Sequence, residues 1–70
     1  MPNLEDDLLK VAGGDRLIAA RVMTEALMAD DPETFQAGYT LENALIGASE
    51  YMRVDITALR AEVERRMGTP

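Results

Sequence analysis

Seventy residues without cysteine or histidine carry a formal net charge of −6, and 47% of them are hydrophobic. A chain of this length forms one domain at most, residues 1–70, near the size at which a single hydrophobic core is marginally stable. The composition excludes a stabilising disulfide and the usual ligands of a structural zinc. We therefore expect self-association, as a homodimer, or docking on a larger protein.

The missing residue types also exclude most catalytic chemistry. Histidine is the usual general base, and the chain has one serine, Ser49, and one lysine, Lys10. The adjacent acids at 6–7 and 30–31 lie where helix caps and first-turn acids are expected. We predict no enzyme, no cofactor and no metal site. No apolar run approaches the roughly 20 residues of a membrane span, and the acidic start MPNLEDD differs from a signal peptide; we therefore expect a cytoplasmic location.

Caps and helix breakers divide the chain into five predicted helices. These helices span residues 4–12, 16–29, 32–37, 41–52 and 56–67. Each begins after a residue whose side chain can cap a helix: Asn3, Asp15, Asp31, Thr40 and Asp55. The pair Gly13-Gly14 ends the first helix, because glycine readily adopts the left-handed conformation found there. The second helix is apolar around most of its circumference, which is typical of a central helix.

Helical spacing of apolar residues indicates the buried faces. In the fourth helix one face holds Leu41, Ala44, Leu45, Ala48 and Met52. In the last helix the inward residues are Ile56, Leu59, Val63 and Met67, and Val22 is expected in the core of the second. No segment alternates as a strand would. The pattern predicts an all-α fold: a small bundle of four helices plus one short helix, ending in an αα-hairpin.

The stretch SEYMRVDITALRAEV resembles the turn and second helix of helix-turn-helix DNA-binding proteins. The matching residues are Ser49, Met52, Val54, Asp55 and Leu59. Arg53 stands where that family usually has glycine, at a turn that often needs a positive φ, and Glu62 occupies a commonly apolar position. The resemblance implies a transcription regulator that binds DNA through residues 46–66. The contacts that it implies are Arg53, Thr57 and Arg60.

The distribution of charge favours a different function. Residues 1–50 hold ten acids and three bases, whereas residues 51–70 hold three acids and four bases. DNA binding draws much of its affinity from basic side chains on phosphates. We expect Arg53 and Arg60 to balance nearby acids such as Glu50 and Glu64 instead. The preferred hypothesis is a small acidic regulatory protein that binds another protein, as an inhibitor or adaptor of the phage-type or DNA-mimic-like kind; the helix-turn-helix regulator is the alternative.

Two of the predicted helices carry more apolar side chains than one buried face requires. Ala19, Met23 and Met28 extend the apolar surface of the second helix, and Ile46 and Tyr51 lie off the main face of the fourth. Such residues are either ordinary exposed surface or an interface. We predict a partner or dimer interface that contains Met23, Met28, Ile46 and Tyr51. The acidic amino-terminal half is either a solubilising face or a surface for a basic partner.

Overall fold

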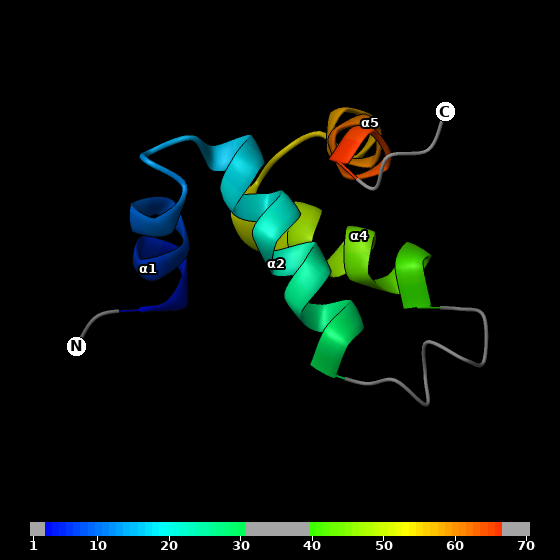
Figure 1. Cartoon of the computed structure of the whole chain (residues 1–70), viewed down its shortest axis with the longest axis horizontal. Helices are drawn as coiled ribbons and strands as arrows, with labels where there is room; N and C mark the ends of the chain where they lie inside the picture. The colour runs from blue at the N-terminus through cyan, green and yellow to red at the C-terminus, as the bar shows by residue number, and fades with distance from the viewer. Residues whose placement is uncertain (1–2, 31–39, 67–70) are drawn as a thin grey trace.

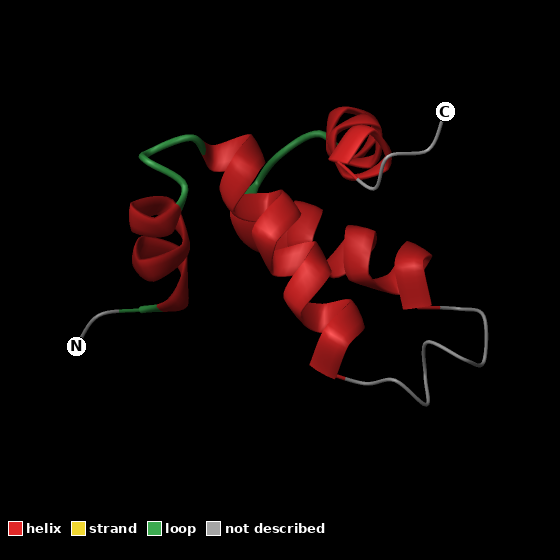
Figure 2. Ribbon diagram, in the orientation of Figure 1, coloured by secondary structure: helices red, strands yellow, loops and turns green. Residues whose placement is uncertain are grey.

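The computed structural model describes residues 3–30 and 40–66 of the chain. This part contains four helices and no strand, as Figure 2 shows, and the all-α prediction is confirmed. The helices are α1 (Leu4–Val11), α2 (Arg16–Asp30), α4 (Thr40–Met52) and α5 (Ile56–Arg66). Thr40, predicted as a cap, is the first residue of α4. The predicted short helix 32–37, the cap Asp31 and the inward residue Met67 lie outside the described residues.

The helix starts follow from local capping, as the sequence predicts. Asn3, Asp15 and Asp55 each place a side-chain oxygen 2.8–3.2 Å from backbone nitrogens two or three residues further along. These contacts satisfy N–H groups that have no partner inside the helix. Helix α1 ends at Gly13 and Gly14, whose φ values of 67° and 89° cost glycine little. Local chemistry therefore determines where the first two helices and the last one begin.

Helix α2 is central: it contacts α1, α4 and α5, and α4 also contacts α5. In Figure 1, α4 passes behind α2, while α1 lies to one side. The core cluster consists of Leu8, Ala19, Ala20, Leu45, Ala48, Met52, Leu59 and Val63. The predicted burial of Leu45 and Leu59 is confirmed, whereas Val22 is only partly buried. Ala19, expected to be surplus apolar surface, is fully buried, because α2 is packed by helices on more than one side.

A three-residue turn, residues 53–55, joins α4 to α5. Figure 1 shows α5 end-on where α4 is seen from the side, so their axes cross instead of running alongside each other. Helix α5 also packs on α2. The predicted bundle ending in an αα-hairpin is therefore not confirmed, and α5 lies across the other helices.

None of the helices in residues 3–30 and 40–66 combines the length and the apolar character that crossing a membrane requires.

Candidate functional site

The turn between α4 and α5 has the backbone conformation that the helix-turn-helix resemblance requires. Arg53 has a φ of 58°, although it stands where the family usually has glycine. The Val54 N–H donates to the carbonyl oxygen of Ser49 at 3.0 Å, which closes the end of α4. Asp55 then caps α5 by accepting from the Ala58 N–H at 2.9 Å. Arg53 thus adopts the positive φ that glycine usually provides at this turn, and its Cβ makes that conformation less favourable.

The buried positions of the resemblance are occupied as expected, with one exception. Met52 and Leu59 are fully buried, and Ser49 is 8% exposed. The exception is Glu62, whose side chain is 14% exposed at a position that is commonly apolar. A carboxylate in such a place needs compensating charge.

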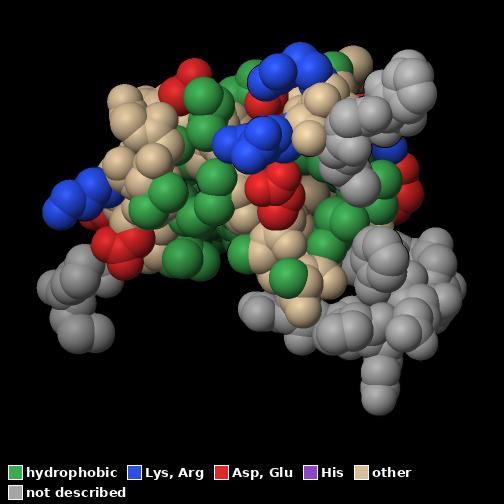
Figure 3. Space-filling model, in the orientation of Figure 1, with side chains coloured by type: hydrophobic (Ala, Val, Ile, Leu, Met, Phe, Trp, Pro, Cys, Tyr) green, Lys and Arg blue, Asp and Glu red, His purple; other side chains and the backbone are tan. Residues whose placement is uncertain are grey.

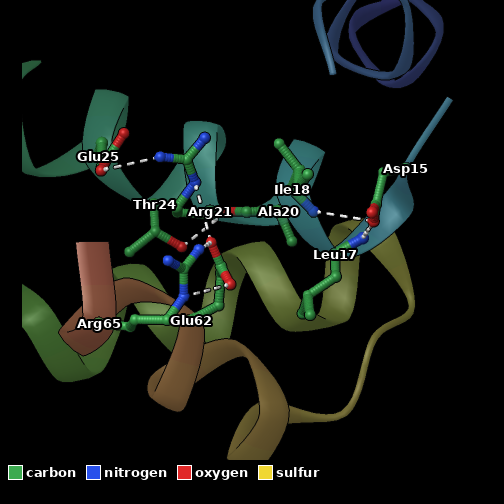
Figure 4. A network of polar contacts seen from close by, with 9 residues as sticks. All are labelled: Asp15, Leu17, Ile18, Ala20, Arg21, Thr24, Glu25, Glu62 and Arg65. Carbon is green, nitrogen blue, oxygen red and sulfur yellow. Dashed lines mark hydrogen bonds and ion pairs between the residues drawn. The ribbon is translucent and has the colours of Figure 1, made fainter. Parts of the chain in front are cut away.

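Arg21 of α2 and Arg65 of α5 supply the compensating charge at Glu62 (Figure 4). The Oε2 atom of Glu62 lies 2.7 Å from Nη2 of Arg65 and 3.7 Å from Nε of Arg21. Arg21 also lies 3.8 Å from the carboxylate of Glu25. Its Nε is buried and makes no hydrogen bond among the described residues. Glu62 is therefore held by charges from two helices, and this network joins α2 to α5.

The arginines proposed as DNA contacts are engaged with acids of the same chain. Nη2 of Arg53 lies 2.7 Å from Oε2 of Glu5. Arg60 pairs with both carboxylate oxygens of Glu42, one of them at 2.8 Å. These partners differ from the acids expected, Glu50 and Glu64. The third proposed contact, Thr57, is exposed at the start of α5.

The ion pair between Arg60 and Glu42 shifts the pKa values of both groups. A hydrogen bond from Arg60 lowers the pKa of Glu42, and the same bond raises the pKa of Arg60. Glu64 adds a smaller, longer-range attraction to Arg60. Among the described side chains on the face shown in Figure 3, basic ones lie next to acidic ones. This face is therefore a poor match for a polyanion.

Glu5 of α1 holds two arginines at once, an arrangement that we call the Glu5 clamp. Its Oε2 atom accepts from Nη1 of Arg16 at 2.5 Å and from Nη2 of Arg53 at 2.7 Å. Nη1 of Arg16 also donates to the carbonyl oxygen of Met52 at 3.0 Å. The hydrogen bonds from Arg16 and then Arg53 lower the pKa of Glu5. The clamp therefore ties α1 to the start of α2 and to the end of α4.

Apolar side chains form a second candidate site. Among the described residues, the exposed large hydrophobic ones are Leu4, Val11, Leu27, Ile46 and Tyr51. Ile46 and Tyr51 were predicted for an interface, and both are exposed; the other two predicted residues, Met23 and Met28, are partly buried, and Met23 packs against the core.

Leu4, Val11 and Leu27 were not predicted as interface residues. The first two are seven residues apart and therefore share a side of α1, a sequence signal that indicates surplus apolar surface there. Leu27 lies on α2, and its 38% exposure is set by the packing of α2 on its neighbours.

Ile46 and Tyr51 lie on opposite sides of the exposed face of α4. The five-residue step between them turns a helix by about 140°. Cδ1 of Leu27 lies 3.9 Å from where a Cβ on Gly47 would be. Tyr51 follows Gly47 by one helical turn and so lies on the side of α4 that faces Leu27. We call this apolar strip, Leu27, Gly47 and Tyr51, the Leu27–Tyr51 edge.

Neither a metal site nor a comparison with known proteins indicates a function. No group of three or more acidic side chains within residues 3–30 and 40–66 is arranged to hold a metal ion. No protein-family model, curated protein or solved structure matches this chain.

Proposed function

We propose that this chain is a small acidic regulatory protein, without catalytic activity, that acts by binding another protein as an inhibitor or adaptor. One observation supports this proposal above the others. Five arginines of the described part are in ion pairs with acids of the same chain, while five large apolar side chains remain exposed. Binding along a nucleic-acid backbone draws on several basic groups that are not already paired, whereas exposed apolar groups suit a protein interface.

The proposed docking surface is the Leu27–Tyr51 edge. Tyr51 is an amphipathic aromatic side chain of the type enriched at the centres of interfaces. Its neighbour Glu50 is exposed and makes no ion pair with another described residue. A basic side chain at the rim of the partner would therefore be favoured. A larger partner with a basic surface, a homodimer and a cytoplasmic location all belong to this proposal.

Capture of the tagged chain from lysate with and without nuclease treatment, followed by binding measurements with the purified captured protein, tests the docking surface. We expect Leu27→Ser and Tyr51→Ser to weaken that binding, because each removes apolar area from the edge. Leu4→Ser is the matched control, since Leu4 is 52% exposed on a different helix. Equal loss in the control, or capture of nucleic acid alone, would contradict the proposal.

The homodimer is tested separately by light scattering over a concentration series. We expect twice the chain mass and a melting temperature that rises with concentration, because association stabilises the folded state by mass action. A monomer whose melting temperature is independent of concentration would exclude the homodimer.

A helix-turn-helix regulator remains the second candidate, because the turn at Arg53 has a positive φ and α5 crosses α4. Fluorescence anisotropy against pooled genomic fragments at about 0.15 M salt tests it, since surface charges are screened beyond roughly 8 Å there. Sequence-selective binding that Arg60→Ala abolishes and Arg65→Ala preserves would favour this candidate. Arg65 is the control because it lies in the last turn of α5.

A further inference from the structure

We propose that Arg16 and Arg53 form a binding site for a phosphate group, which Glu5 closes with its own carboxylate. The two guanidinium groups come from the start of α2 and from the turn after α4, yet both donate to the same oxygen of Glu5. Phosphate groups are bound in the same way, by two guanidinium groups that donate to one anion. The site goes beyond the proposed protein docking and uses none of the Leu27–Tyr51 edge.

Arg16 has a contact that does not involve Glu5, and the backbone of Arg53 is set by the turn. Nη1 of Arg16 donates to the carbonyl oxygen of Met52, a fully buried residue, at 3.0 Å. The φ of 58° at Arg53 fixes the direction in which its side chain leaves the turn. The side chains of Arg16 and Arg53 are 37% and 70% exposed. An external anion can therefore reach both groups without unfolding α2 or α4.

The element that carries Glu5 is weakly anchored compared with the rest of the fold. Helix α1 has eight residues; Leu8, 9% exposed, is its one buried side chain, and Leu9 is partly buried against the core. It is joined to α2 through Gly13 and Gly14, and a Cβ at either glycine would meet no atom within 4 Å. Moving α1 away from the arginines costs mainly the packing of Leu8 and Leu9, so α1 acts as a cover that carries Glu5.

Phosphate is the ligand class that can displace this cover. Glu5 is tethered to the site, so it competes at a high effective concentration with any single carboxylate from outside. The hydrogen bonds from Arg16 and Arg53 keep the pKa of Glu5 below its ordinary value of 4.5, so Glu5 is charged at neutral pH. A phosphate monoester carries up to two charges and three acceptor oxygens, and a nucleic-acid backbone offers several phosphates in a row. Both sources share the chemistry that the two guanidinium groups recognise.

The test is a titration of the Glu5→Gln variant, followed by NMR of the arginine side-chain Nε–H signals. One series uses inorganic phosphate, and the other uses a short DNA duplex, each against sodium chloride of the same ionic strength. We expect the Glu5→Gln chain to bind at least one of them about tenfold more tightly than the unchanged chain, with shifts at Arg16 and Arg53. Adding Arg53→Gln to this variant should abolish the gain.

Asp7→Asn is the matched control, because Asp7 is an exposed acid in the same turn of α1 and makes no ion pair among the described residues. It removes the same charge without opening the site and should leave binding unchanged. Shifts with inorganic phosphate support a site for free phosphate, and shifts with the duplex alone support a backbone phosphate. An equal gain for Glu5→Gln and Asp7→Asn, or no response at either arginine, would overturn the proposal.

Circular dichroism shows whether the Glu5→Gln chain keeps its helices. If it does not, the unchanged chain is titrated to high phosphate concentration. Signals of Arg16 and Arg53 that shift together then support the site, and signals that stay fixed overturn it. Failure of this proposal leaves the protein-docking proposal intact, because the variants that test the two share no residue.

Discussion

The positive φ of Arg53 leads to a prediction in which backbone and side-chain effects can be separated. At a φ of 58° a residue with a Cβ is crowded by its own backbone, and glycine is not. Both Arg53→Gly and Arg53→Ala remove the hydrogen bond to Glu5. The difference between these two variants therefore reports only the backbone conformation of the turn.

We expect Arg53→Gly to be more stable than Arg53→Ala by about 1 kcal/mol, after allowing for the greater freedom of glycine in the unfolded chain. In a domain of this size that difference corresponds to roughly 4–8 °C in melting temperature. The loss common to both variants should be small, because the Arg53 side chain is 70% exposed.

Urea denaturation of the two variants measures the difference, with Ala61→Gly as the control. Ala61 is exposed within α5, where φ is helical. There glycine should cost about 1 kcal/mol relative to alanine, so the sign is the reverse of that at Arg53. If Arg53→Gly and Arg53→Ala unfold at the same urea concentration, the argument that the turn stores backbone strain is wrong.

Three further predictions concern the core and the ion pairs. Leu45 is fully buried, so Leu45→Ala should lower the free energy of unfolding by about 2–5 kcal/mol in urea denaturation; a melting temperature within a few degrees of the unchanged chain would contradict the packing described. The pKa of Glu42 is lower in the folded chain than its ordinary value of 4.5, so its pairing stabilises the fold above that pH and is lost as the pH falls through the folded-state pKa. Thermal melts between neutral pH and acid should show a smaller decline for Glu42→Gln than for the unchanged chain, and identical declines would count against this pairing. Glu62→Gln should cost about 1 kcal/mol or more in chemical denaturation, because it leaves Arg21 without its charge partner in α5. Glu25→Gln should change stability by less than about 0.5 kcal/mol, since Glu25 is 41% exposed. Equal effects of Glu62→Gln and Glu25→Gln would contradict the prediction that Glu62 is the more important partner of Arg21.

Several features of this molecule were predictable because they depend on residues close in sequence. Asn3, Asp15 and Asp55 cap helices, and Gly13-Gly14 ends one, through hydrogen bonds and dihedral preferences that span only a few residues. The apolar face of α4 followed from helical spacing, because side chains three and four residues apart lie together on any helix. The need for a positive φ at residue 53 also follows from local turn chemistry.

The partners of the charged residues were decided by the tertiary structure alone. Arg53 was expected to pair with Glu50 but pairs with Glu5, which is 48 residues away in sequence. Ala19 was assigned to the surface but is fully buried. Both outcomes depend on how whole helices are placed around α2. The apolar residues of one helix determine which of its faces is buried, but they do not specify the crossing direction of the helix that covers it. Long charged side chains then pair with whichever opposite charge that crossing brings within reach, and for this reason the Glu5 clamp exists only in the folded chain.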